Sequence, residues 1–349
     1  IKPFRQSYDW ASGYRHDDPT ILGFSHTHFS GSGHSDLGDL LLTPLSGEVK
    51  WEPGDTDQPG SGYRSRFDKA TETAEPGYYA VNLTDSGVRA ELTAGTRVGL
   101  HRYNFPAGQP AHVLLDFRRS IYDYPGKVLW SRIRVRPDGT VTGFRETRGW
   151  APARQLYFAM RFSQPMTSHA IRNAETDVPY NGFRQPGRAP EDKTVLEGRA
   201  LEAAFDFGSL DGPLLVKVAI STDDEEGAIR NLDSEGGDFD FESLRASTRA
   251  AWEQALGAVD IDAAEDMRTS LYTALYHALI APSVSGDVDG RYRGPDNQVH
   301  TAEGFTFHSS FSLWDTFRAE HPLLTIVQPE QKNADMIHSL LASQQASPH

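Results

Sequence analysis

Short runs of strand-forming residues, separated by turn residues, fill the chain from residue 78 to about residue 220. The clearest hairpin surrounds the turn at 137–140, and in its first strand Arg132 and Arg134 face one side while Ile133 faces the other. No helical pattern separates the runs, which favours an antiparallel β-sandwich over alternating strands and helices. The predicted strands cover residues 78–83, 88–92, 96–105, 112–117, 128–136, 141–148, 155–162, 199–207 and 213–220.

Beyond residue 240 the apolar residues recur at spacings of three and four, which predicts amphipathic helices. In one of them Leu271, Leu275 and Leu279 form an apolar stripe that needs neighbours. The last helix ends just before His349, so we expect the chain to be the front part of a longer protein. The predicted helices cover residues 241–256, 263–281, 312–327 and 329–345.

Residues 223–242 separate the two patterns and carry nine acidic side chains, one arginine and the pair Gly236-Gly237. We interpret this stretch as a solvated linker. The sequence then divides into a β-sandwich over 1–222, an acidic linker and linker helix over 223–262, and the start of a helical domain over 263–349.

The charge, the apolar runs and the cysteine content of the chain exclude several classes of function. The 349 residues include 48 acidic and 34 basic side chains, a net charge of −14, which argues against nucleic-acid binding. No run of about 20 apolar residues, the length that spans a bilayer, is present. The absence of cysteine excludes disulfides, thiolate zinc sites and a cysteine nucleophile.

A loop rich in histidine and glycine, GFSHTHFSGSG, covers residues 23–33. In an extended segment His26 and His28 would point to the same side, as in the H-x-H pairs of some zinc hydrolases. Two other interpretations stay open: a loop that lines a ligand site, and a purely structural loop. The predicted strands that follow are hairpin-linked rather than parallel, unlike those of such zinc hydrolases.

Two further stretches carry candidate chemistry. Asp287 to Asn297 resembles the opening of an EF-hand, but Gln298 stands where the bidentate glutamate belongs, which favours a tight Asp-Gly hairpin against the helices. Trp314 and Asp315 open a predicted helix, where an acidic residue favours the helix dipole. A ring beside a carboxylate also suits a sugar subsite, and spacing alone does not decide between these.

The chain resembles family 92 of the glycoside hydrolases, the calcium-dependent, inverting, exo-acting α-mannosidases. Three blocks carry the resemblance, and they span nearly the whole chain in the family's order. Its fold implies an antiparallel β-sandwich followed by the beginning of an (α/α)₆ toroid. The blocks are GFSHTHFSGSG (23–33), SRFDKATETAEPGYYAVNL (65–83), and GRYRG with FSLWDTFRAEHPLL (290–294 and 311–324).

The resemblance also implies a substrate pocket between the two domains, which binds the terminal mannose of mannose-containing glycans. Phe24 and Ser25 would meet Trp314 and Asp315 around that sugar, with Glu72 on the aglycone side. The catalytic acid and base, and the ligands of Ca²⁺, are expected beyond residue 349, in the remaining part of the toroid. No metal ligand is therefore assigned to this chain.

Two alternatives remain. Within the family, the leaving group could be a mannose-1-phosphate in a phosphodiester, which needs no general acid because it is already acidic. In another class, the chain could be a glycan-binding sandwich module without catalysis, although the SLWDTFRAEHP block has no evident use there. Secretion from a bacterium is inferred from the function, since no signal peptide is visible.

Overall fold

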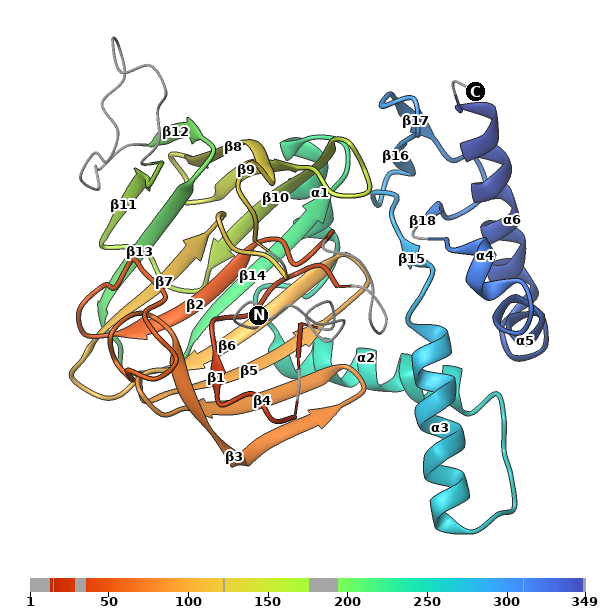
Figure 1. Ribbon diagram of the computed structural model, residues 1–349, viewed down its shortest axis with the longest axis horizontal. Helices are drawn as coiled ribbons and strands as arrows, with labels where there is room; N and C mark the ends of the chain where they lie inside the picture. Colours follow the sequence, from red (N-terminus) through yellow and green to blue (C-terminus); the bar gives the residue numbers. More distant parts are fainter. Residues whose placement is uncertain are drawn as a thin grey trace.

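The computed structural model describes residues 13–14, 16–28, 36–121, 123–175, 194–309 and 311–347, and the statements below concern these residues. Two antiparallel sheets pack face to face, and a helical part follows them in the chain and lies to one side (Figure 1). Mostly antiparallel sheets followed by helices are the predicted fold class, which is thereby confirmed.

The larger sheet has ten strands and the smaller has four. The order in the larger sheet is β1 (Thr20–Ile21), β3 (Ser65–Glu75), β4 (Tyr78–Leu83), β5 (Val88–Ala94), β6 (Val98–Asn104), β14 (Leu214–Ser221), β10 (Arg154–Phe162), β9 (Val141–Thr147), β8 (Val128–Val135) and β12 (Val195–Gly198). The order in the smaller sheet is β11 (Ser168–Asn173), β13 (Leu201–Ser209), β7 (Pro110–Asp116) and β2 (Leu41–Ser46).

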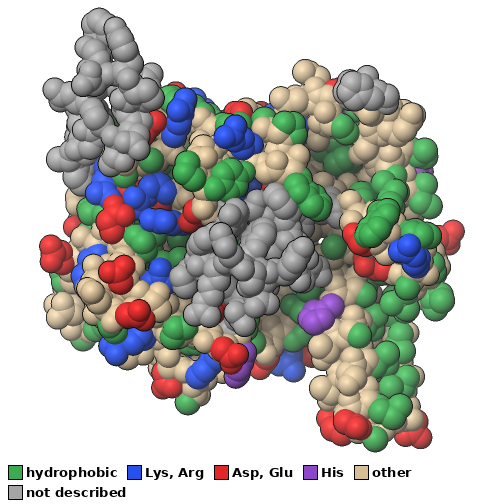
Figure 2. Space-filling model, in the orientation of Figure 1, with side chains coloured by type: hydrophobic (Ala, Val, Ile, Leu, Met, Phe, Trp, Pro, Cys, Tyr) green, Lys and Arg blue, Asp and Glu red, His purple; other side chains and the backbone are tan. Residues whose placement is uncertain are grey.

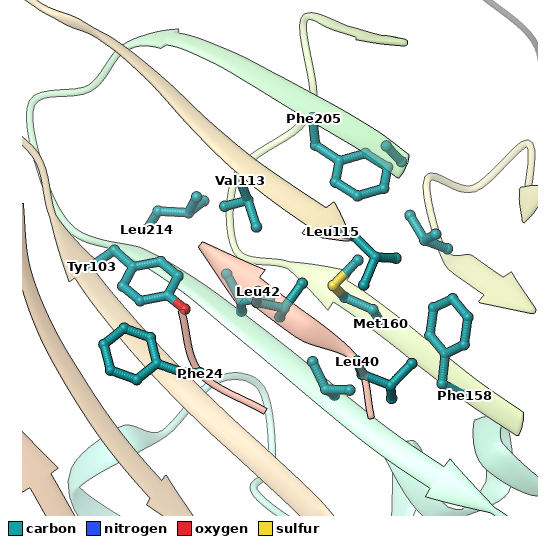
Figure 3. Close-up of a cluster of buried hydrophobic side chains, with 14 of the residues drawn as sticks. Phe24, Leu40, Leu42, Tyr103, Val113, Leu115, Phe158, Met160, Phe205 and Leu214 are labelled. Atoms are coloured by element: carbon teal, nitrogen blue, oxygen red, sulfur yellow. The ribbon is translucent and has the colours of Figure 1, made fainter. Parts of the chain in front are cut away.

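Apolar side chains from the facing sides of the two sheets fill the sandwich core (Figure 3). Phe158 and Met160 come from the larger sheet, and Val113, Leu115 and Phe205 come from the smaller one. On β7 the outer face is buried as well, because Leu114 packs under the segment that contains Trp51 and Tyr63. Residues 113–115 are therefore apolar without alternation.

Each of the nine predicted strands is found, and the hairpin around 137–140 joins β8 to β9. Of the strands in the two large sheets, sequence reasoning missed β1, β2, β3, β11 and β12. In β2, Pro44 argues against a strand, but β2 lies at the edge of its sheet, where a missing N–H is tolerated. In β3, the alternation of apolar and polar residues is weak because only Ser65 is buried and the other residues are partly or fully exposed.

The prediction of a solvated linker over 223–242 is wrong, because residues Glu225–Ser234 form helix α1. Asp224 caps the helix by accepting a hydrogen bond from the backbone N–H of Gly227. Ala228 and Leu232 are buried against β6, β10 and β14. The helix therefore packs on the larger sheet and covers part of its outer face.

The acidic residues of α1 neutralise the arginine face of β8. Glu225 accepts a hydrogen bond of 2.9 Å from Nε of Arg132 and lies 3.7 Å from Arg134. Glu226 forms an ion pair with Arg136. The acidic segment that was interpreted as a solvated linker thus binds the arginine face of β8.

Helix α2 (Phe241–Leu256) begins against the larger sheet and leads to α3 (Glu265–Leu279), and α6 (Glu330–Gln345) lies farther from the sandwich (Figure 1). All three are close to their predicted bounds. The segment predicted as one helix over 312–327 is two, α4 (Leu313–Thr316) and α5 (Glu320–Val327). Pro322, which lacks an N–H, sits in the first turn of α5, where no intrahelical donor is needed. Leu275 packs against Leu324 in the core of this part.

Two short two-stranded sheets connect α3 to α4, and the second is a hairpin that lies within the first in the chain. They are β15 (Ser283–Val284) with β18 (His308–Ser309), and β16 (Arg291–Arg293) with β17 (Val299–Thr301).

Hydrogen bonds from the turn before β16, and from β16 itself, bind the β16–β17 hairpin to the sandwich. Asp287 accepts hydrogen bonds from Ser221 Oγ at 2.7 Å and from Asn231 Nδ2 at 2.8 Å. Arg293 donates to the carbonyls of Thr222 and Asp223, each at 2.7 Å. The predicted tight Asp-Gly turn is confirmed, and it lies against α1 and the end of β14. It precedes β16, however, and the hairpin itself turns at Gly294–Asn297.

Asp223 gives this junction a pH dependence. Burial and the neighbouring carboxylate of Asp287 raise the pKa of Asp223 to about 7, although Arg293 opposes the shift. The folded protein therefore binds more protons at this site than the unfolded chain. Its contribution to stability is present at low pH and is lost as the pH rises toward about 7.

We expect Asp223→Asn to remove this dependence, because the amide keeps the shape of the neutral acid. The measurement is the melting temperature of the full-length protein at about pH 5 and about pH 8. The wild type should lose more stability between these values than the variant, whereas equal losses would contradict the raised pKa.

Candidate functional site

A pocket of about 320 Å³ opens where the N-terminal segment crosses strands β3 to β5. This volume lies within the range of roughly 300–1,000 Å³ that is usual for small-molecule sites. Most of the lining is apolar and aromatic, with few polar groups. The lining residues are Gly13, Tyr14, Asp18, Thr20, Ile21, Gly23, Phe24, Ser25, His28, Phe67, Ala74, Tyr79 and Leu92.

The loop Phe24–His28 forms one side of this pocket and is bound to the smaller sheet. Phe24 exchanges both backbone hydrogen bonds with Leu42, at 2.8 and 2.9 Å. The Phe24 ring is buried and lies beside the Tyr103 ring, with ring centroids 6.5 Å apart (Figure 3). Ser25, the next residue, is partly exposed in the pocket.

Gly23 allows the loop to approach β2 closely. A Cβ at this position would lie 2.4 Å from Oγ1 of Thr43 and 2.6 Å from the carbonyl oxygen of Leu42. Neither atom can yield easily, because the Thr43 hydroxyl donates to the carbonyl of Leu22 at 2.6 Å. Glycine is therefore required here for space.

The middle of the loop is held by a buried carboxylate. Thr27 donates its hydroxyl to Asp39 at 2.7 Å and accepts the backbone N–H of Asp39 at 3.0 Å. Asp39 is paired with Arg145 at 2.6 Å and also with Arg154. Burial opposes ionisation of Asp39, but the two guanidinium groups hold its pKa well below its usual range.

Glu72 organises the aromatic wall of the pocket. Its carboxylate accepts hydrogen bonds from Tyr79 at 2.8 Å, from Tyr14 at 3.1 Å and from Lys69 at 2.6 Å. Burial opposes ionisation of Glu72, but Lys69 and the tyrosine hydroxyls lower its pKa. Glu72 is therefore an anion that orients two pocket tyrosines.

Trp314 and Asp315 lie on α4, away from the lining of this pocket. The Trp314 side chain is 77% exposed. Asp315 is exposed too, and it accepts a hydrogen bond from the hydroxyl of Ser312, which precedes the helix. The structure thus brings Phe24, Ser25 and Glu72 together around one pocket and leaves Trp314 and Asp315 on a separate exposed helix.

The two histidines of the loop, His26 and His28, differ in their hydrogen-bond partners and in their exposure. Both ring nitrogens of His26 are engaged, one with the carbonyl of Leu40 and the other with His101, so His26 is not placed as a metal ligand. His28 is exposed and lines the pocket. These positions favour the interpretation of a ligand-lining loop. Residues 29–33 of the same block lie outside the described residues.

The residues present do not fit the calcium ion that the resemblance implies. Within the described ranges, no group of three or more His, Asp or Glu side chains is arranged to hold a metal. The carboxylate of Asp287 accepts hydrogen bonds from Ser221 and Asn231, which agrees with a structural role in the turn before β16.

Three residues of this region escaped sequence reasoning: Tyr14, Tyr79 and His101. Tyr79 falls within the block 65–83, where the repeated tyrosine was a usable signal. Tyr14 and His101 reach the site from distant parts of the chain, and no local pattern marks them.

Comparison with known proteins gives the family. Residues 1–221 match the glycosyl hydrolase family 92 N-terminal domain, and residues 227–348 match the family 92 catalytic domain. The chain belongs to family 92 of the glycoside hydrolases, as its three sequence blocks predicted.

Solved structures of the family agree. The family GH92 α-mannosidase BT3965 of Bacteroides thetaiotaomicron is 39% identical, with a TM-score of 0.87 over 98% of this chain and 45% of that one. The GH92 glycosyl hydrolase ccman5 is 31% identical, with a TM-score of 0.80 over 95% and 44%. The inverting mannosidase BT2199 of B. thetaiotaomicron is 25% identical, with a TM-score of 0.78 over 96% and 42%.

Among curated proteins, an uncharacterized secreted glycosidase of Arthroderma benhamiae is 24% identical over 339 residues, which cover 88% of this chain and 40% of that protein. The chain therefore spans less than half the length of these relatives.

Gly23→Ala should destabilise the loop, because its methyl group would push the loop away from β2. We expect a loss of about 1–3 kcal/mol in the free energy of unfolding, which thermal melting measures. Gly212→Ala is the matched control, since a Cβ there meets nothing within 4 Å. Equal melting temperatures of the two variants would contradict the close approach.

Proposed function

We propose that the full-length protein is an exo-acting α-mannosidase that releases terminal α-linked mannose from glycans with inversion. The observation that carries this proposal is the match of nearly the whole chain to BT3965, a family α-mannosidase that has also been solved in complex with mannoimidazole. The description of BT2199 as an inverting mannosidase supports the stereochemistry.

The sandwich side of the sugar site is assigned to Phe24 and Ser25. Both line the pocket, and the loop that carries them is fixed by hydrogen bonds to β2 and to Asp39. The Ser25 hydroxyl can donate to or accept from a sugar hydroxyl. A loop fixed before the substrate arrives lowers the entropic cost of binding.

The aglycone side is assigned to Glu72, acting with the tyrosines it orients. Tyr14 and Tyr79 present aromatic surface in the pocket, and such surface stacks on the apolar face of a sugar ring. Because the Glu72 carboxylate already binds three donors, its role is to position these rings.

The helical side is assigned to Trp314 and Asp315. The exposed indole is available for stacking, and the Asp315 carboxylate can accept hydrogen bonds from two sugar hydroxyls. Inverting hydrolysis also needs an acid and a base roughly 6.5–9.5 Å apart, so that a water molecule fits between the base and the sugar. We assign these two roles to the part of the family's catalytic domain beyond residue 349.

Calcium is proposed as the cofactor of the full-length enzyme, with ligands from that same part of the catalytic domain. Within the described residues, no group of three or more His, Asp or Glu side chains is placed to hold a metal ion, and no step is assigned to the ion here. Secretion is also proposed, and the description of the fungal relative as secreted supports it. Over the residues that the structure describes, no helix is long and apolar enough to cross a membrane.

The proposed activity is tested by incubating the full-length protein with an α-linked mannobiose and following the products by proton NMR. We expect mannose release, with the β anomer appearing first because inversion converts α to β. A chelator should abolish release, and added calcium should restore it.

Three results would count against this account. Cleavage of a mannose-1-phosphate diester without cleavage of mannobiose would favour the phosphodiester-cleaving alternative. Binding of mannobiose without cleavage would favour the glycan-binding module. Restoration by zinc alone would return the H-x-H pair to consideration.

Asp315→Ala in the full-length protein should lower kcat/KM for the same substrate by roughly a hundredfold or more, because hydroxyl contacts that strengthen in the transition state are lost. Asp262→Ala is the control, since Asp262 is also exposed in the helical part. A loss below about threefold at Asp315 would remove this residue from the sugar site.

A further inference from the structure

Two imidazole rings, one buried (His101) and one partly buried (His26), lie against each other beside the pocket loop. His26 comes from the loop and His101 from β6, with ring centroids 4.9 Å apart and an angle of 28° between the ring planes. Their Nε2 atoms are 2.9 Å apart. The Phe24 ring, which belongs to the pocket loop, lies at 75° to the His101 ring, with ring centroids 6.4 Å apart.

The partners at the two ends decide where the protons lie. Nδ1 of His26 is 2.9 Å from the carbonyl oxygen of Leu40, which can only accept, so this nitrogen donates. A neutral imidazole carries one proton, and Nε2 of His26 must then accept from Nε2 of His101. Nδ1 of His101 is left as an acceptor, and the Tyr103 hydroxyl donates to it at 2.6 Å.

Both rings are neutral in this arrangement. Burial lowers the pKa of His26 to about 4, outweighing its contact with the Leu40 carbonyl and the charge of Asp39. Burial, together with the nearby His26, lowers the pKa of His101 well below its usual value. Tyr103 is fully buried, and burial raises its pKa, so the phenol keeps its proton.

The backbone at Leu40 and Gly99 accommodates the two histidine rings. Leu40 has a φ of +55°, in the left-handed region that leucine rarely adopts, and His26 satisfies its carbonyl. A Cβ on Gly99 would lie 3.2 Å from Cδ2 of His26, so this glycine leaves room for the ring. The row of hydrogen bonds ends on a backbone carbonyl, which does not take up a proton, and it therefore cannot transfer one.

We propose that His26 and His101 are positioning residues: the one-directional row of hydrogen bonds from Tyr103 through His101 and His26 to Leu40 fixes the loop Phe24–His28 at the pocket. The consequence for mannose binding rests on the proposed function, whereas the positioning of the loop does not. The row requires a donor at the Nε2 position of residue 101. A side chain that only fills space at residue 101 would need neither this donor nor the length that brings it to His26, so the two roles can be told apart.

The test compares His101→Gln with His101→Asn in the full-length protein. A glutamine amide reaches the Nε2 position and can still donate to His26, whereas an asparagine amide reaches only the Nδ1 position. Hydrogen exchange of the peptide 22–28 reports loop position without any need for activity. We expect exchange about tenfold faster in the Asn variant and close to wild type in the Gln variant.

Kinetics with 4-nitrophenyl α-mannoside supply a second measurement. The Asn variant should raise KM roughly tenfold with kcat changed by less than about threefold, and the Gln variant should restore KM. If the wild type releases no mannose from the α-linked mannobiose, the proposed function fails, and hydrogen exchange still tests the loop. Equal exchange in the two variants, whether both fast or both slow, would overturn the proposal.

Should the Asn variant not fold, Tyr103→Phe takes its place. This change removes the hydroxyl that donates to His101 while the ring still fills its site. The proposal then requires faster exchange in peptide 22–28, and unchanged exchange would overturn it.

Discussion

The candidate site depends on one buried ion cluster, in which Asp39 is held between Arg145 and Arg154. A carboxylate excluded from water is costly unless it is paired and hydrogen-bonded, and here both requirements are met. Arg145 is itself fixed by donating to the carbonyl of Phe117 at 2.8 Å. The hydroxyl of Thr27 completes the cluster, which places the pocket loop relative to both sheets.

Charge also joins the sandwich to the helical part. The acidic start of α1 binds the arginine face of β8, and Asp287 binds the end of β14 and α1. Hydrophobic contacts add to these polar ones, because Phe241 and Leu244 of α2 are buried against the larger sheet. Elsewhere the helical part keeps apolar surface in solvent, including Phe317, Ile326 and Ile337, and hydrophobic side chains are visible on it at the right of Figure 2.

Much of the fold could be predicted from local pattern. The helix at Phe241–Leu256 and the strand at Tyr78–Leu83 have the expected bounds, because one periodic face and clear turn residues define each. Helix α1 was mistaken for a linker because its partners on β8 lie about ninety residues earlier in the chain, as in the contact of Arg132 with Glu225. In the site, Phe24, Ser25 and Glu72 were identified through family blocks, whereas the contact of His26 with His101 arises only from tertiary packing. The meeting of Phe24 and Ser25 with Trp314 and Asp315 stays a prediction.

The central claim is that the loop fixed by Asp39 forms the sandwich side of a mannose site completed by Trp314 and Asp315. A crystal structure of the full-length protein with mannoimidazole, the ligand solved with BT3965, tests it most directly. The account predicts a sugar ring in contact with Phe24 and Ser25, with a hydroxyl within hydrogen-bonding distance, about 2.5–3.2 Å, of the Asp315 carboxylate. A ligand bound without contact to the loop Phe24–His28 would contradict it.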